Sequence, residues 1–281
     1  MSGRRRITGV SLVELMVALG VGLALCLMMA TLHARVSHLS GRASAAADAQ
    51  DTLRIALATL EYELAHTGYW GLVPDAALIA GRRGDAVPLA VAVAGDCGAG
   101  WAIDLDRPLV AWSGGWPLAC SPYAGAPPVS GALVLRRVAT RPQVPDAGVL
   151  QVYGDPWGGR LAADGAPAAP GESVHDLVAR AYYVSPRSTA DPARPSLRRK
   201  TLQRGPRVID EEIVVGVARM EIAVGVDTDA PATPGHGRPN HFVAPEAATG
   251  EIVALRIRLT SDEDARLSLT RTIALRNGSV P

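Results

Sequence analysis

The N-terminal end of the chain passes from a short polar segment into a long apolar one. Residues 1–9 include three adjacent arginines, whereas no residue from Leu15 to Leu32 is charged. As a helix, these 18 residues would be about 27 Å long, which is close to the thickness of a bilayer core. Because the arginines precede the apolar run, the positive-inside rule leaves the leader in the cytoplasm and the rest of the chain outside.

A second stretch has helical periodicity with one apolar side. Four leucines recur at spacings of four, three and four residues: Leu53, Leu57, Leu60 and Leu64. Four charged residues fall off this stripe: Asp51, Arg54, Glu61 and Glu63. The spacing predicts an amphipathic helix that ends at Gly68. We therefore expect one helix from Val10 to His66, roughly 85 Å long, with residues 10–35 apolar all round and residues 36–68 apolar on one face. Three glycines are candidate break points within this helix: Gly20, Gly22 and Gly41.

The remaining part, residues 69–281, reads as a β-rich domain. Apolar and polar residues alternate from Val253 to Leu259, which is typical of a half-buried strand, and residues 267–273 continue this pattern weakly. Further strands are expected at 129–139, 148–153 and 177–184. Loops rich in proline and glycine are expected at 124–128, 155–170, 186–195 and 230–245. The predicted fold is α+β, a long N-terminal helix packed on a mostly antiparallel sheet.

The three cysteines occupy two kinds of environment. Cys26 lies inside the apolar run, whereas Cys97 and Cys120 lie in the later, more polar part. The separation of the latter two suits one disulfide in an oxidising compartment, which would stabilise the fold by roughly 3 kcal/mol. Two unpaired buried thiols are the alternative. No Cys/His cluster with zinc-ligand spacing occurs, so we expect no metal site.

Charge and motifs bear on the class of activity. The net charge of +1 argues against a general nucleic-acid binder. No catalytic motif was found, and we expect no enzyme activity and no cofactor. The six histidines are scattered and each is expected to be solvated or locally bonded, with His175, His236 and His241 in loops. Asp227 and Asp229 flank a turn, for which an Asx turn is favoured over a Ca²⁺ site.

Two other groups of side chains have a structural and a functional interpretation. The chain has five tryptophans and a single phenylalanine, and four of the tryptophans lie in the domain beyond residue 100: Trp101, Trp112, Trp116 and Trp157. Burial in the core is favoured over an exposed binding patch. Four cations form a modest cluster: Arg198, Arg199, Lys200 and Arg204. A solvated strand face is favoured over an exposed arginine stripe, which a DNA-binding surface would need.

Glu14 distinguishes between interpretations of the apolar segment. A carboxylate in a membrane helix is expensive, about 2.5–3.5 kcal/mol at the centre, and normally has a partner. A cleaved secretory signal has no use for it, and the apolar run is longer than such signals have. A lipoprotein signal ending at Cys26 would need a small residue where Leu25 stands. The third interpretation is a retained helix whose leader is clipped before the apolar run; an uncleaved signal anchor is its alternative.

The segment from Gly9 to Leu15, Gly-Val-Ser-Leu-Val-Glu-Leu, resembles the class III signal of type IV prepilins. The resemblance implies that a prepilin peptidase cuts after Gly9 and that the new N-terminus, Val10, is methylated. In that family the glutamate, here Glu14, pairs with the new α-amino group, so each charge relieves the desolvation of the other. Glu14 would also lie in the first helical turn, where the helix dipole favours a negative charge. Val10 departs from the phenylalanine usual in the family.

The two ends of the following domain resemble minor pilins of the PilW type. The similarity covers residues 60–71, from Leu-Glu-Tyr-Glu-Leu-Ala to Gly-Tyr-Trp-Gly, and the closing segments 215–229, 252–259 and 272–277. It implies a non-catalytic minor pilin of a type IV pilus that works in assembly, priming or a tip complex. The implied partners are other minor and major pilins through the N-terminal helix, the prepilin peptidase and the bacterial inner membrane.

The same resemblance implies a periplasmic domain that is later carried to the pilus or cell surface. The nearest alternative is a minor pseudopilin of a type II secretion system, which shares the N-terminal signal and helix. An alternative of another class is a membrane-anchored periplasmic enzyme or ligand-binding domain. It would have an N-terminus that is uncleaved or cleaved beyond Leu32, and a defined polar pocket.

Overall fold

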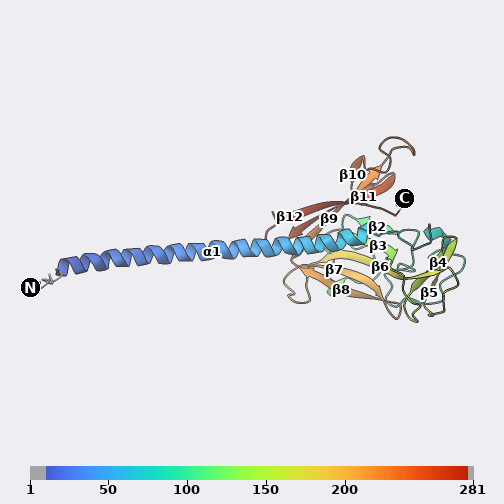
Figure 1. Ribbon diagram of the computed structural model, residues 1–281, viewed down its shortest axis with the longest axis horizontal. Helices are drawn as coiled ribbons and strands as arrows, with labels where there is room; N and C mark the ends of the chain where they lie inside the picture. The colour runs from blue at the N-terminus through green and yellow to red at the C-terminus, as the bar shows by residue number, and fades with distance from the viewer. Residues whose placement is uncertain (1–10, 278–281) are drawn as a thin grey trace, which may run out of the picture. The chain divides into compact units, whose positions relative to one another are not determined.

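The computed structural model describes residues 11–277. Helix α1 (Leu12–Ala65) has 54 residues, and Gly20, Gly22 and Gly41 do not interrupt it (Figure 1). The expected long N-terminal helix is thus confirmed. It contributes to two compact parts of the chain, residues 1–48 and residues 49–281.

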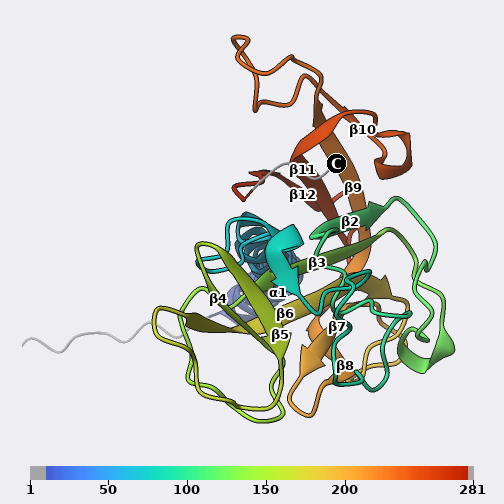
Figure 2. The ribbon, with the colours of Figure 1, turned by 90° about the vertical axis from the view of Figure 1, so that its right-hand side faces the viewer.

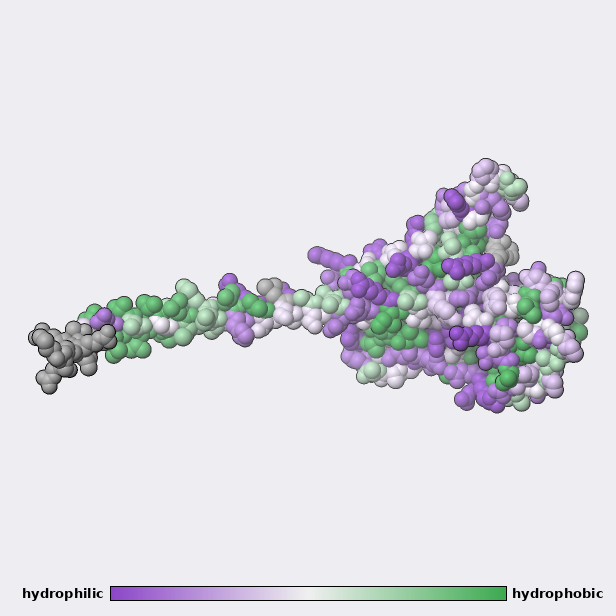
Figure 3. All heavy atoms as spheres, viewed as in Figure 1, coloured by the Kyte–Doolittle hydropathy of each residue, from purple (hydrophilic) through white to green (hydrophobic). Residues whose placement is uncertain are grey.

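In the first part, α1 exposes a continuous apolar surface. Its large apolar side chains are more than half exposed, from Leu12 at 75% to Val36 at 55%. Figure 3 shows this surface along the N-terminal half of the helix. The segment is long and apolar enough to cross a membrane, with a mean hydropathy of 2.4 in its most apolar window. A membrane anchor and a signal sequence both meet this description.

In the second part, the last turns of α1 bury the predicted leucine stripe. Leu53, Leu60 and Leu64 are fully buried and Leu57 is 3% exposed. They share one apolar cluster with Leu133 and Leu135 of one sheet and with Met220, Ile222, Leu255 and Ile257 of another. Figure 2 shows the two sheets on either side of this end of the helix. Because both sheets cover the stripe, α1 is the centre of the core.

The larger sheet has eight strands. Their bounds are β1 (Ile79–Ala80), β2 (Leu109–Trp112), β3 (Ala132–Val138), β4 (Gln151–Asp155), β5 (Gly158–Ala162), β6 (Ser173–Ser185), β7 (Ser196–Gln203) and β8 (Arg207–Val215). The order is β1-β5-β4-β6-β3-β2, and β7 pairs with β6 and β8. All pairs are antiparallel except β1 with β5. The strand β6 joins the two ends of the sheet because β3, β4 and β7 all pair with it.

The smaller sheet has four antiparallel strands in the order β10-β9-β11-β12. Their bounds are β9 (Val217–Asp227), β10 (His241–Val243), β11 (Glu251–Ser261) and β12 (Ser268–Ala274). Three short 3-10 turns complete the described elements: η1 (Ala76–Leu78), η2 (Tyr123–Gly125) and η3 (Pro245–Ala247). The α+β class with a mostly antiparallel sheet is therefore confirmed.

Two predicted loops are wrong in part because they contain strands. The segment 155–170 holds β5, and the segment 230–245 holds β10. In β4 and β5 the glycines are required by close packing: a Cβ atom at Gly154 would lie 2.3 Å from Val73 Cγ2. A glycine that looks like a turn residue in the sequence is thus a strand residue over which another side chain packs.

Candidate functional site

Glu14 occupies the first turn of α1 and is the only Asp, Glu, Lys or Arg between Leu12 and Ala34. Its side chain is exposed, in a helix face made of apolar residues. The N-terminal end of a helix dipole favours a carboxylate at this position. The expected cleavage position, Gly9 and Val10, lies outside the described residues, so the pairing of Glu14 with an amine at Val10 stays a prediction.

A buried ionic cluster fixes the end of α1 to the larger sheet. The side chain of Glu63 is 4% exposed and that of Arg137 of β3 is 6% exposed. Arg137 Nε donates to Glu63 Oε2 at 3.2 Å, and Arg137 Nη2 donates to Glu63 Oε1 at 3.1 Å. Arg180 of β6 also donates to Glu63 Oε1. Glu63 falls off the leucine stripe but is buried nonetheless, and its counter-charges come from the sheet that covers it.

The sequence holds a signal for this cluster that the periodicity misses. Arg136 and Arg137 stand side by side within the apolar strand β3, and both are buried. Arg136 points to the other face, where its Nε donates to Trp101 O at 2.7 Å and its Nη1 to Arg107 O at 2.6 Å. Burial lowers the pKa of Arg136 to about 10. Charged residues in the middle of an apolar strand indicate buried partners on both faces.

Cys97 and Cys120 form a disulfide, with an S–S distance of 2.13 Å. Cys26 is free and exposed on α1. The disulfide belongs to a separate apolar cluster, on the face of the larger sheet that carries Val134 and Ala181. Trp116 Nε1 donates to Cys120 O at 2.5 Å, and its ring lies 4.7 Å from that of Tyr183. The bridge thereby holds the segment between β2 and β3 on the sheet.

The tryptophans do not share one environment. Trp101 is 5% exposed and belongs to the cluster of the disulfide, together with the partly buried Trp112. Trp157 is 86% exposed at the turn between β4 and β5, where Asp155 Oδ1 accepts hydrogen bonds from Trp157 N and Gly158 N. The preference for core aromatics therefore fails for Trp157.

Three of the four cations lie on the strand β7, as expected, but they do not form a solvated face. Arg204 follows β7, and its side chain is 65% exposed and pairs with Asp146. In β7 the side chain of Arg198 is 3% exposed and pairs with Asp210 at 2.7 Å and with Glu212 at 3.0 Å. Arg199 pairs with Glu211 at 2.8 Å, and Lys200 pairs with Asp210 at 2.9 Å. These acidic residues come from β8, directly across the strand pair. The charges of Arg198, Arg199 and Lys200 are thus compensated within the sheet.

The turn after β9 is built around Asp227. Asp227 Oδ1 accepts a hydrogen bond from Asp229 N at 2.8 Å, which confirms the expected Asx turn. Asp227 Oδ2 accepts one from Gly237 N at 2.5 Å. These backbone N–H groups hold the pKa of Asp227 below its usual range. The placing of His175 and His241 in loops is wrong: His175 is a buried residue of β6 whose Nδ1 lies 2.7 Å from Ala139 O, and His241 opens β10.

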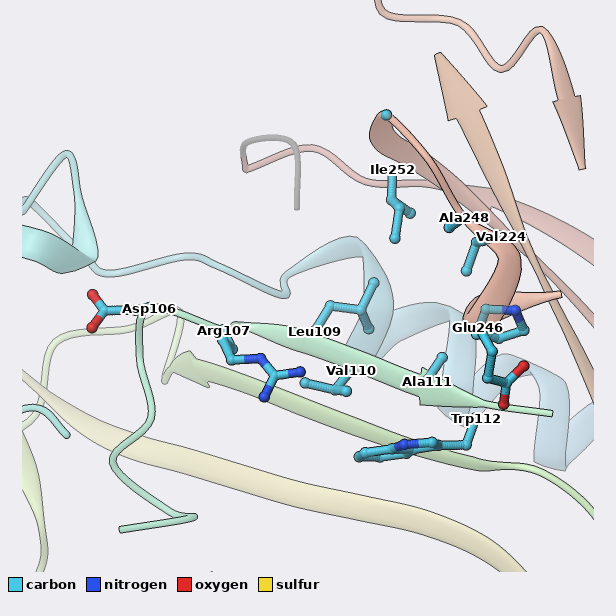
Figure 4. Close-up of a pocket in the computed structure, with 12 residues that line it drawn as sticks. Asp106, Arg107, Leu109, Val110, Ala111, Trp112, Val224, Glu246, Ala248 and Ile252 are labelled. Carbon is cyan, nitrogen blue, oxygen red and sulfur yellow. The ribbon is translucent and has the colours of Figure 1, made fainter. Parts of the chain in front are cut away.

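A groove with a volume of about 270 Å³ lies between β2 and the smaller sheet (Figure 4). Leu109 and Ala111 of β2 point toward it from one side, and Val224, Ala248 and Ile252 point toward it from the other. Glu246 lies at one end, where its Oε1 accepts a hydrogen bond from Ser113 N at 2.7 Å. That hydrogen bond holds the pKa of Glu246 below its usual range.

Comparisons of the chain with protein-family models, with curated proteins and with solved structures gave no match. Of the residues singled out from the sequence, Cys97 and Cys120 come together, whereas Glu14 stands apart on α1. The groove beside β2 was not predicted, since its walls come from segments more than a hundred residues apart.

Proposed function

We propose that the chain is a minor pilin of the PilW type, which is clipped after Gly9 and inserted in the bacterial inner membrane before it joins a pilus or its priming complex. The observation that carries this proposal is the division of one helix into two kinds of surface. Residues 12–36 expose apolar side chains, and the last turns bury theirs against the domain. A helix of this kind has one apolar segment free to pack with lipid or with other helices.

Glu14 gives the exposed half of the helix a means of fixing its register. An unpaired carboxylate among apolar helices is unfavourable, and a nearby ammonium group relieves this. Cleavage after Gly9 creates that ammonium group at Val10, four residues before Glu14. An amine from a neighbouring subunit would reach Glu14 at only one axial offset, so pairing between subunits would fix their register. The work assigned to the chain is thus assembly.

The first test is the processing of the leader. In a bacterium with a prepilin peptidase, Gly9→Val should leave an unprocessed precursor, because a bulky side chain blocks the peptidase. Gly20→Val is the matched control, since a Cβ at Gly20 meets nothing within 4 Å. N-terminal sequencing of the membrane-extracted protein should give Val10 for the wild type and the control. Wild-type protein that begins at another residue would count against the assignment.

The second test separates insertion from assembly. Glu14→Gln should insert and be cleaved normally, yet join the assembled filament fraction at least tenfold less, because the charge partner of the amine is lost. Glu61→Gln, on the exposed face of the same helix, is the control and should assemble as the wild type does. Equal incorporation of both variants would contradict the role of Glu14. Loss of twitching motility rather than of enzyme secretion in a deletion strain separates a pilin from a type II secretion pseudopilin.

A further inference from the structure

From the groove beside β2 we infer a second interaction site: an extended segment of another protein chain adds to the larger sheet as an antiparallel strand along the open edge of β2. This inference concerns residues of the domain and does not depend on cleavage after Gly9. It rests on the direction of the backbone groups of β2, on the apolar wall that faces them, and on charges at the two ends of the groove.

The strand β2 is the last in its sheet, with β3 on one side only. Arg136 N donates to Pro108 O at 2.8 Å, so the carbonyl group of Pro108 points toward β3. In an antiparallel pair, the backbone N–H and C=O groups of every second residue point toward the partner strand. Those of Val110 and Trp112 therefore point toward β3 as well. The N–H and C=O groups of Leu109 and Ala111 therefore point away from β3. No described residue outside the ladder donates to them or accepts from them.

Ser113, the residue after β2, shows which kind of group binds to this edge. Its N–H also points away from β3 and is met by Glu246 Oε1 from the far side of the groove. A carboxylate thus occupies the place where the carbonyl of an added strand would lie. The described residues supply no such partner beside Leu109 and Ala111, the two positions that a short strand would pair with. An exposed edge of this kind is a template for another strand.

The walls of the groove fit apolar side chains at alternate positions of the added strand. On one face of such a strand, side chains would lie against Val224, Ala248 and Ile252, across from Leu109 and Ala111 (Figure 4). A strand of four residues is about 13 Å long and matches the length of β2. The groove is therefore selective for β-branched or small apolar residues that alternate with polar ones.

Charges at the two ends of the groove specify the charged residues of the partner segment. Glu246 lies at the end of β2 near Ser113, and Arg107 precedes the start of β2. Arg107 forms no ion pair with a described residue. An antiparallel strand begins near Glu246 and ends near Arg107, and antiparallel pairing is the stronger kind. The partner segment therefore has a basic residue before its apolar positions and an acidic residue after them.

The test uses an N-acetylated, C-amidated peptide, Lys-Val-Thr-Val-Thr-Glu, titrated calorimetrically into the full chain in detergent. We expect saturable binding, which should weaken at least tenfold for Ala111→Pro. Proline removes the outward N–H and leaves the ladder with β3 intact, because that N–H does not face β3. Val144→Pro is the matched control; it places a proline in an exposed loop that does not line the groove, and it should bind within threefold of the wild type.

A second set of probes keeps the inference testable even if Ala111→Pro fails to fold. The same peptide N-methylated at both valines loses its ladder donors and should not bind, and the peptide with Lys and Glu exchanged should bind more weakly. Equal binding of the methylated peptide, or no binding to the wild type, would overturn the inference. Binding to a variant that ends at Asn277 but not to the full chain would also overturn the inference. In that case residues 278–281 would be the natural occupant of the edge.

Discussion

Glu61 and Glu63 show at the scale of single residues how two glutamates of one helix differ in environment. Glu61 is exposed, whereas Glu63 is enclosed between α1, β3 and β6 with two arginines around it. Both residues lie beside the leucine stripe, so periodicity alone treats them alike. What separates them is the charge on the covering sheet, which is encoded by Arg137 and Arg180, far away in the sequence.

Removal of the Glu63 charge should destabilise the domain strongly. Glu63→Gln leaves two arginines near the core without a counter-charge, and loss of one partner of a buried ion pair costs about 3–5 kcal/mol. The free energy of unfolding from urea denaturation of the detergent-solubilised chain measures the change. Glu61→Gln, the exposed neighbour, should change it by less than about 0.5 kcal/mol. Similar values for the two variants would show that the ionic cluster does not hold the helix on the sheet.

At the scale of elements, the sequence predicts a strand well when the pattern of apolar and polar residues within that strand matches its buried and exposed positions. In β11, Leu255, Ile257 and Leu259 are buried and Arg256 and Arg258 are exposed, as the alternation predicts. The expected strand at 177–184 is likewise present, although β6 begins earlier, at Ser173. In β11 one face meets the core and the other meets solvent, so a period of two is visible in the strand itself. The strand β6 is covered on both faces, and its signal is a nearly continuous apolar run.

The strand β8 could not be found in this way. Its centre, Asp210, Glu211 and Glu212, reads as a polar break in an apolar run. In the structure these acids lie directly across from Lys200, Arg199 and Arg198 of β7. Opposite charges in facing positions stabilise a strand pair, but they are recognised only when the partner strand is known. The same limit hides the groove beside β2, whose two walls become neighbours only through the fold.

At the scale of the whole molecule, the domain has one core shared by the helix and both sheets, and one segment, between β2 and β3, that a disulfide holds. The leucine stripe of α1 is covered by both sheets, so the helix and the two sheets depend on one another. The segment between β2 and β3 is different, because it contributes to a separate cluster on the outer face of the larger sheet and is bridged to Cys97. Its stability should therefore depend on the disulfide more than on the central core.

Serine substitutions at the three cysteines test this dependence. Conversion of Cys97 and Cys120 together to serine should lower the free energy of unfolding by about 3 kcal/mol, because the unfolded chain regains the freedom of the bridged loop. The expected site of the change is local: hydrogen exchange should rise first in residues 113–128, while the buried residues of β11 stay protected at low denaturant. Cys26→Ser is the matched control, since Cys26 is exposed and free, and it should change neither quantity. If the double variant and the control unfold alike, the bridge is not what holds this segment, and the contacts of Trp116 with Cys120 and Tyr183 carry its stability instead.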